Sequence, residues 1–258
     1  MAAYTTIDDP EAYFQTVIWT GDGSDGRTIT LPGDTNMQPD FIWSKNRGDG
    51  EDHCLMDVVR TFASGKAMRT NGHDEEGGVG TAARGWTEAT SDGFTVEDGS
   101  SNANLVNDDG NTYVAWCWKE SATSGFDIVA YTGTGSAHTE SHSLSAVPHL
   151  MIVKNRSDSD AWRVYHHGNT AAPETDYLVL NTTAATADDS AAWNDTAPTS
   201  SVFSVGTSDQ TNENTDSFIA YLFSEIQGFS KFGSYTGNGN ADGTFVYTGF
   251  RPAFVIQK

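Results

Sequence analysis

The sequence predicts an all-β protein made of tandem antiparallel β-sandwich units. Three observations predict it: a pattern that occurs three times, short apolar runs, and turn-forming residues between the runs. The pattern opens with the glycine-containing segments Trp19–Gly23, Tyr131–Gly135 and Tyr235–Gly239. In each copy a proline is then followed six residues later by a lysine: Pro39 and Lys45, Pro148 and Lys154, Pro252 and Lys258. Such a repeat constrains the architecture before any single residue is interpreted.

Short apolar runs after each proline predict strands. Phe41–Trp43, Leu150–Val153 and Phe254–Ile256 are rich in β-branched or aromatic residues, and a proline suits the start of a strand. Residues 161–166 alternate between two faces, as a half-buried strand does. Clusters of Gly, Asp, Asn, Ser and Thr between the runs predict turns. Many short strands separated by turns are typical of a β-sandwich.

Helices are expected to be few and short. The two candidates are residues 8–11, where Pro10 suits a first turn, and residues 57–67. The spacing of the copies gives the domain size, since Lys154 lies 109 residues after Lys45. That period indicates tandem domains, because solenoid repeats are roughly 20–50 residues long. We therefore expect a first sandwich over 1–122 with an N-terminal arm and a second over 123–227. Residues 228–258 are either the start of a third, truncated repeat or extra strands added to the second.

Charge and hydropathy exclude several classes of partner. The chain has 14 Lys and Arg against 35 Asp and Glu, which gives a net charge of −21. This balance argues against nucleic acid, because phosphate backbones are bound by cationic side chains. It argues equally against anionic membranes. No apolar segment is long enough for membrane insertion, and the N-terminus lacks the basic and apolar regions of a signal peptide.

Candidate metal and thiol chemistry is limited. Residues Asn238, Asn240 and Asp242 place oxygen ligands at alternate positions before a glycine, as a calcium loop begins, but Gly249 stands where that loop has its closing glutamate. The segment is either a weak calcium site or a hairpin turn. We expect no other cofactor. A disulfide between Cys54 and Cys117 is left open, although Cys117 matches Leu222 of the next copy and suits a core position.

Aromatic residues allow two interpretations. Trp86 and Trp193 lie in polar surroundings, so each is either a sugar-stacking platform in an exposed loop or a buried anchor, the interpretation that we prefer. A pair of tryptophans two residues apart, at 116 and 118, is replaced by Tyr221 and Phe223 in the second copy. Retained size with changed polarity predicts core packing for that pair.

No complete catalytic motif is present. The glycines at 21, 23 and 26 fit a dinucleotide fingerprint, but a strand-like segment follows them where a helix is required. Glu174 and Asp176 begin a glucanase-like set of carboxylates, yet Val179 occupies the last position. His166 and His167 point to opposite faces if they lie on a strand. We therefore expect that the protein is not an enzyme.

Several segments together resemble a family of structural proteins of tailed phages, common among marine phages. The resemblance covers essentially the whole chain. It is carried by residues 3–10, 38–47, 113–118, 147–156 and 198–204 and most specifically by 229–239 and 245–254. It implies concanavalin A-like jelly-roll domains and no catalytic residues.

The resemblance also implies a role and a location. We expect a viral structural protein of the virion tail, a fibre or a surface decoration, made in the host cytoplasm. Its partners would be other virion proteins and further copies of itself, with a trimer suggested by analogy with fibres. The alternative is a carbohydrate-binding, lectin-like module that recognises a glycan on the host surface.

Overall fold

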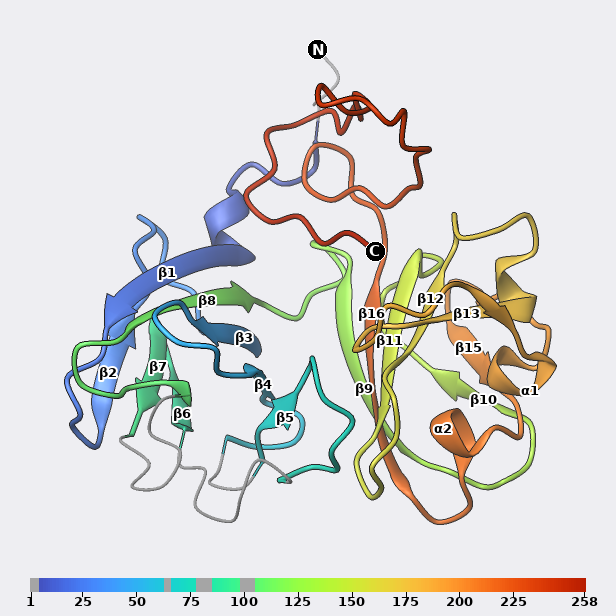
Figure 1. Cartoon of the computed structure of the whole chain (residues 1–258), viewed down its shortest axis with the longest axis horizontal. Helices are drawn as coiled ribbons and strands as arrows, with labels where there is room; N and C mark the ends of the chain where they lie inside the picture. Colours follow the sequence, from blue (N-terminus) through green and yellow to red (C-terminus); the bar gives the residue numbers. More distant parts are fainter. Residues whose placement is uncertain (1–4, 63–65, 78–84, 98–104) are drawn as a thin grey trace.

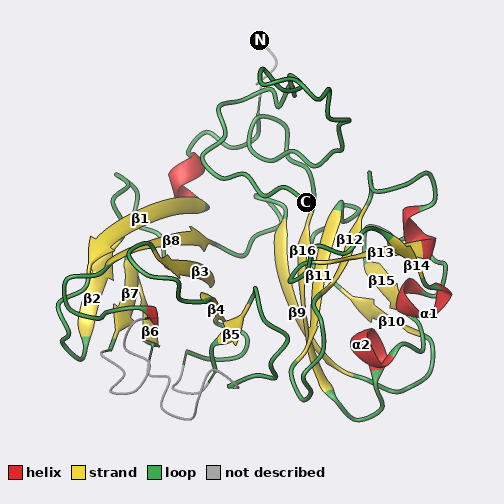
Figure 2. Ribbon diagram, in the orientation of Figure 1, coloured by secondary structure: helices red, strands yellow, loops and turns green. Residues whose placement is uncertain are grey.

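The computed structural model describes residues 5–62, 66–77, 85–97 and 105–258, and its regular structure is almost entirely antiparallel β-sheet (Figures 1 and 2). The predicted all-β sandwich class is confirmed. The strands are β1 (Phe14–Thr20), β2 (Arg27–Thr30), β3 (Phe41–Asn46), β4 (His53–Asp57), β5 (Met68–Arg69), β6 (Trp86–Thr90), β7 (Gly93–Val96), β8 (Thr112–Trp118), β9 (Phe126–Thr132), β10 (His138–Ser141), β11 (Leu150–Asn155), β12 (Arg163–His166), β13 (Asp176–Val179), β14 (Ala187–Asp188), β15 (Val202–Val205) and β16 (Ser217–Phe223).

The strands form two units with matching topology. In the first unit, β1 to β8, one sheet has the order β1-β8-β3-β4-β5 and the other β2-β7-β6. In the second unit, β9 to β16, the sheets have the orders β14-β13-β12-β11-β16-β9 and β10-β15. The larger sheets therefore share one arrangement, in which the last long strand of the unit lies between its first and third strands. Each unit buries a core between its larger and its smaller sheet.

Strand register shows that the two units bury equivalent positions. Trp116 on β8 lies opposite Trp43 on β3, and Tyr221 on β16 lies opposite Ile152 on β11. The same positions also match on the other side, where β8 pairs with β1 and β16 pairs with β9. Because each central strand has the same neighbours in the same register, the correspondence seen in the sequence is a structural one.

The two repeat lysines perform the same local task. Lys45 Nζ donates to the main-chain oxygens of Asn46 at 2.5 Å and Asp49 at 3.0 Å. Lys154 Nζ donates to Asn155 at 2.5 Å and Asp158 at 3.0 Å. Each ammonium group thus closes the turn that follows its strand by satisfying two carbonyl groups.

Core packing was expected for Trp116 and Trp118, but neither side chain lies in the core between the two sheets of the first unit. Side chains of a strand alternate between faces, and on β8 the buried set is Tyr113, Ala115 and Cys117. The two tryptophans therefore lie on the outer face of the larger sheet, where they are half-buried. Their large size is retained because that outer face is itself a packing surface.

Helices are short throughout the described chain. They are η1 (Pro10–Ala12), η3 (Pro173–Thr175), α1 (Ser190–Trp193) and α2 (Asp209–Asn212). The expected helix near residue 10 is confirmed, and Asp9 caps it by accepting from the Glu11 N–H at 3.1 Å. Among the described residues, no helix could cross a bilayer.

The other expected helix does not form over residues 57–62 and 66–67, its described parts. Strand β4 ends at Asp57, whose carboxylate accepts from the Arg60 main-chain N–H at 2.9 Å and from Arg60 Nε at 2.5 Å. The side chain thereby supplies a turn in place of the helical hydrogen bonds. Thr61 continues the turn with a φ of 66°.

The outer faces of the two larger sheets pack against each other. Phe41 of the first unit contacts the rings of Phe126 and Tyr221 edge-on, with centroids 5.5 Å and 4.9 Å away. The same apolar cluster includes Leu55 from the first unit and Trp162 from the second. Burial of this aromatic surface joins the two sandwiches.

A polar network lies within that apolar interface. The Tyr221 hydroxyl donates to Asp57 Oδ2 at 2.6 Å, and both side chains are buried. Arg60 continues the network to Glu76, with Nη1 3.2 Å from Oε1. Glu76 in turn accepts from Arg156 Nη2 of the second unit at 2.7 Å. Buried charges need such partners, so the network fixes how the units meet.

Residues 229–258, which we call the tail, form no helix or strand. They lie as a red loop above the two units in Figure 1, and not as strands added to the second unit. Phe254 anchors the tail by packing against an aromatic set on the outer face of the first unit. The set is Phe14, Trp43, Trp116 and Trp118, with ring centroids 6.4, 6.2, 5.4 and 5.2 Å away.

The substitution Tyr221→Phe tests the buried network. It removes the hydroxyl that donates to Asp57 and leaves a buried carboxylate with one donor fewer. We expect the free energy of unfolding to fall by about 1.5–3 kcal/mol, the range for hydrogen bonds to charged groups. Urea denaturation followed by circular dichroism measures this change.

The matched control is Tyr247→Phe, which removes a hydroxyl from a ring that is 74% exposed. A surface change of this kind is expected to alter stability by less than about 0.5 kcal/mol. Equal effects of the two substitutions would contradict a special role for the Tyr221 hydroxyl.

Candidate functional site

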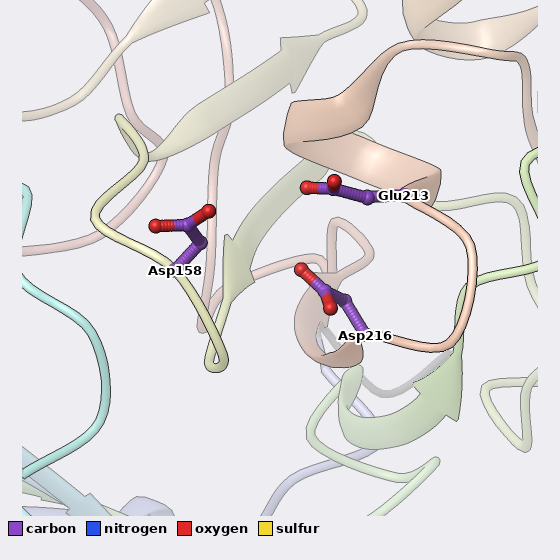
Figure 3. A group of neighbouring side chains, drawn as sticks. All are labelled: Asp158, Glu213 and Asp216. Atoms are coloured by element: carbon purple, nitrogen blue, oxygen red, sulfur yellow. The ribbon is translucent and has the colours of Figure 1, made fainter.

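Three carboxylates converge at one end of the second unit. Asp158, Glu213 and Asp216 each offer an oxygen, and these oxygens lie within 4.8 Å of one another (Figure 3). Asp158 lies in the turn after β11, and the other two lie between α2 and β16. We call these residues the carboxylate trio. None of the three was a candidate from the sequence, since Asp158 lies far along the chain from Glu213 and Asp216.

Neighbouring polar groups hold the trio in place. Asn155 accepts from the Asp158 main-chain N–H at 3.2 Å and donates through Nδ2 to Asp216 Oδ2 at 2.9 Å. The pKa of Glu213 is raised by desolvation and then by the negative charges of nearby aspartates, including Asp216 and Asp158. The arrangement therefore concentrates negative charge on a turn that is already fixed.

The equivalent place in the first unit has an asparagine as one of its three residues. Its equivalent residues are Asp49, Asp108 and Asn111, and the amide Nδ2 of Asn111 donates to both carboxylates, at 3.0 Å and 2.8 Å. In the second unit Asp216 replaces that asparagine, so a carboxylate stands where the first unit has an N–H donor. Repulsion among the three is relieved by protonation or by a cation. Carboxylate oxygens are the ligands that Ca²⁺ takes.

A second acidic pair lies where the two units are joined. Glu120 follows β8 and Asp127 lies on β9, and they share a shallow groove with His142 and Ser143. Asp127 accepts from the Ser143 N–H at 2.5 Å and from its hydroxyl at 2.8 Å. Glu120 accepts from the Ile128 N–H at 3.3 Å.

The environments of this pair push the two pKa values apart. Burial, together with a hydrogen bond to Asp127, raises the pKa of Glu120 to about 7. The pKa of Asp127 is lowered: desolvation raises it, but hydrogen bonds from Glu120 and Ser143 outweigh that effect. Glu120 therefore holds a proton that it shares with Asp127 at mildly acidic pH. One acid and one base in contact can exchange a proton.

The candidate sugar-binding residues are buried. Trp86 is 1% exposed and Trp193 is not exposed, so neither can offer a ring face to a sugar. Trp86 packs in the first core, and Trp193 packs in the second and donates through Nε1 to the Asp176 main-chain oxygen at 3.0 Å. The platform interpretation is corrected, and the anchoring interpretation is confirmed. The polar neighbours of Trp193 in sequence belong to the turn at residues 194–195, which follows α1.

The candidate calcium loop in the tail has the hydrogen bonds of a turn. Asn238 Nδ2 donates to the Gly243 oxygen at 2.5 Å, and Asn238 Oδ1 accepts from the Asn240 N–H at 2.9 Å. Asp242 is exposed and is not part of the carboxylate trio. The sequence does contain a sign of the trio: in the alignment of the two copies, Asp216 of the second stands opposite Asn111 of the first.

The remaining candidates do not come together. Cys54 and Cys117 are both free and buried, and burial raises the pKa of Cys54 to about 12. The thiols are therefore held protonated and unreactive. Glu174 lies in η3 while Asp176 begins β13, which leaves no strand face carrying both.

Substituting Asp216→Asn tests the electrostatics of the trio. The new amide can donate to both neighbouring carboxylates, as Asn111 does in the first unit. We expect the midpoint of thermal unfolding to rise by about 1–3 °C in low salt. The gain should shrink as salt is added, because screening weakens repulsion between exposed charges. Differential scanning fluorimetry measures both effects.

The control substitution is Asp242→Asn, in the exposed loop of the tail. It removes the same charge without supplying a donor to a carboxylate pair, so no change is expected. Addition of Ca²⁺ gives a second comparison: an ion held by the trio would raise the midpoint of the wild type and of Asp242→Asn but not of Asp216→Asn. A lower midpoint for Asp216→Asn would contradict repulsion within the trio.

The pH dependence of stability tests the acidic pair. A carboxyl whose pKa is raised in the folded state binds more protons than in the unfolded state, so its contribution declines as pH rises from about 4.5 through about 7. We expect the stability difference between wild type and Glu120→Gln to fall across this window. Urea denaturation at a series of pH values measures it, with Glu88→Gln, on an exposed side chain, as the control. A difference that stays constant, or rises, would contradict the assignment.

Comparison with known proteins places the chain in a family. No curated protein matches the sequence, and no solved structure matches it. A family described as a domain of unknown function, DUF7483, matches residues 9–258. This match includes both units and the tail, and the chain belongs to that family.

Proposed function

We propose that the protein is a structural component of a tailed-phage virion, in the tail, a fibre or a surface decoration. The observation that carries this proposal is the way the two sandwiches are joined. Their outer sheet faces, which could otherwise present a ligand surface, are packed against each other around Phe41 and Tyr221. A duplicated unit joined by a buried interface suits a rigid spacer, and the resemblance to phage structural proteins supports the same role.

The polar network supports mechanical coupling of the units. An aromatic interface alone can slide, because hydrophobic contacts are not directional. The hydrogen bonds between Tyr221 and Asp57 and between Arg156 and Glu76 specify a single orientation. A component that transmits force or keeps a fixed spacing within a particle needs such an orientation.

The net charge favours assembly through specific contacts only. A charge of −21 makes copies repel at long range and disfavours non-specific association. We propose other virion proteins, and further copies of this chain, as partners. Specific contacts would have to overcome this repulsion. The repulsion would therefore limit assembly to sites where such contacts form.

Glycan recognition was the alternative, and the two tryptophans suggested for it are buried. We therefore do not propose a glycan site at these two residues. We also propose no catalytic activity.

The test is the composition of purified phage particles. We expect mass spectrometry of gradient-purified virions to detect the protein at stoichiometric copy number. Antibody–gold electron microscopy should place the label on the tail or the particle surface. Absence from particles, with abundant protein in the lysate of infected cells, would contradict a structural role.

A further inference from the structure

We propose that the tail is a docking surface for one antiparallel β-strand that another polypeptide supplies. The strand would take the place that β8 and β16 have in the two units, and it would have a similar pattern of residues. The inference concerns the binding chemistry of the tail and holds whether or not the protein is part of a virion. It rests on a comparison of the tail with the same segments in the two completed units.

The residue three positions after the repeat proline faces the core in both units, but it is exposed in the tail. Ile42 on β3 is 0% exposed and Met151 on β11 is 1% exposed, whereas the equivalent Val255 is 74% exposed. In both units this side chain enters the core between the sheets. The tail therefore carries a side chain suited to a core that residues 229–258 do not provide.

The aromatic residue of the opening motif shows the same contrast. Trp19 and Tyr131 are 6% and 7% exposed, and each stacks on an aromatic residue of the central strand. The stacked partners are Tyr113 on β8 and Phe218 on β16, at centroid distances of 5.2 Å and 5.1 Å. The equivalent Tyr235 is 47% exposed. In the units, β8 or β16 makes the contact that Tyr235 and Val255 lack in the tail.

A glycine in the tail has no steric purpose in the present structure. At Gly21 a Cβ would overlap the main-chain oxygen of Asp108, and at Gly133 it would overlap that of Glu213. Those oxygens belong to the loops that lead into β8 and β16. At the equivalent Gly237 nothing lies within 4 Å of a Cβ. The position thus permits the close approach of a backbone that arrives with a docked strand.

The turn that receives this backbone is already formed. The second glycine of the motif has a φ of 65° at Gly23, 66° at Gly135 and 69° at Gly239. In the units, an asparagine amide then donates to the carbonyl that follows: Asn107 to Ser24 and Asn212 to Ser136, both at 2.8 Å. A preformed turn lowers the entropic cost of docking.

The outer face of the tail is already docked. Phe254 packs against the aromatic set on the first unit, just as Phe41 at the equivalent position packs between the two units. Side chains at successive positions of a strand point to opposite faces. The tail therefore has its outer contact in place, while its inner face, marked by Val255, stays open.

Topology identifies the occupant. In both units the first and third strands never pair with each other, because β8 or β16 lies between them. The tail segments at these two positions need the same intervening strand. A second copy cannot supply it without unfolding, since β8 and β16 are each paired along both edges. The occupant is a strand of another polypeptide that has an asparagine six residues before an aromatic residue, followed by alternating apolar residues.

The test uses the whole chain and a labelled synthetic peptide with the sequence of residues 212–225, which contains the loop and β16. Fluorescence anisotropy should show saturable binding. Gly237→Val and Val255→Asp should each weaken binding at least tenfold, without changing the thermal midpoint, because both positions are open in the free protein. Hydrogen exchange should slow at 235–239 and 252–258 when the peptide is added.

Two controls separate docking from general stickiness. Val147→Asp, at an exposed valine outside the tail, should bind the peptide as the wild type does. A peptide carrying Ile219→Pro and Tyr221→Pro, which lacks two N–H donors, should not bind. Absence of binding, or equal binding by Gly237→Val and wild type, would overturn the proposal. Tail-dependent dimerisation of the free protein, abolished by Val255→Asp, would overturn it as well, because a second copy would then be the occupant.

Discussion

The structure depends on a buried carboxylate that neither unit satisfies by itself. Asp57 ends β4 in the first sandwich, and its oxygens accept from Arg60 within that unit and from the Tyr221 hydroxyl of the second. Separation of the units would expose the aromatic cluster around Phe41 and would also withdraw one donor from this carboxylate. Apolar burial gives the interface its strength, and the carboxylate gives it its orientation. The two sandwiches therefore form one body with a defined geometry.

Duplication explains both what is alike and what has diverged. The lysine-closed turns, the stacked aromatic pairs and the central strand positions are retained because each satisfies a requirement inside its own sandwich. Divergence is concentrated where the copies meet each other or solvent. Tyr221 replaces Trp116 at the interface, and Asp216 replaces Asn111 at an exposed turn. The tail is a third version of the same opening segments, with its outer face docked through Phe254 and its core face open at Val255.

Much of the fold could be predicted from the sequence, because the repeat and the alternating strands are local patterns. The burial of Trp86 and Trp193 could be favoured but not decided, since both have polar neighbours in the sequence and only the assembled sheets enclose them. The outward direction of Trp116 was missed because retained size does not reveal which of two packed faces a residue serves. The carboxylate trio was missed for another reason: Asp158 and Asp216 meet only through the pairing of β11 with β16. Its trace in the sequence is the replacement of Asn111 by Asp216, which a position-by-position comparison of the two copies shows.

Scanning calorimetry of the whole chain tests most directly whether the two sandwiches form one body. Units that share a buried carboxylate and an aromatic core should unfold together. We expect a single endotherm in which the calorimetric enthalpy equals the van't Hoff enthalpy. Two resolved endotherms, or a calorimetric enthalpy about twice the van't Hoff value, would show that each sandwich unfolds independently and would contradict this account.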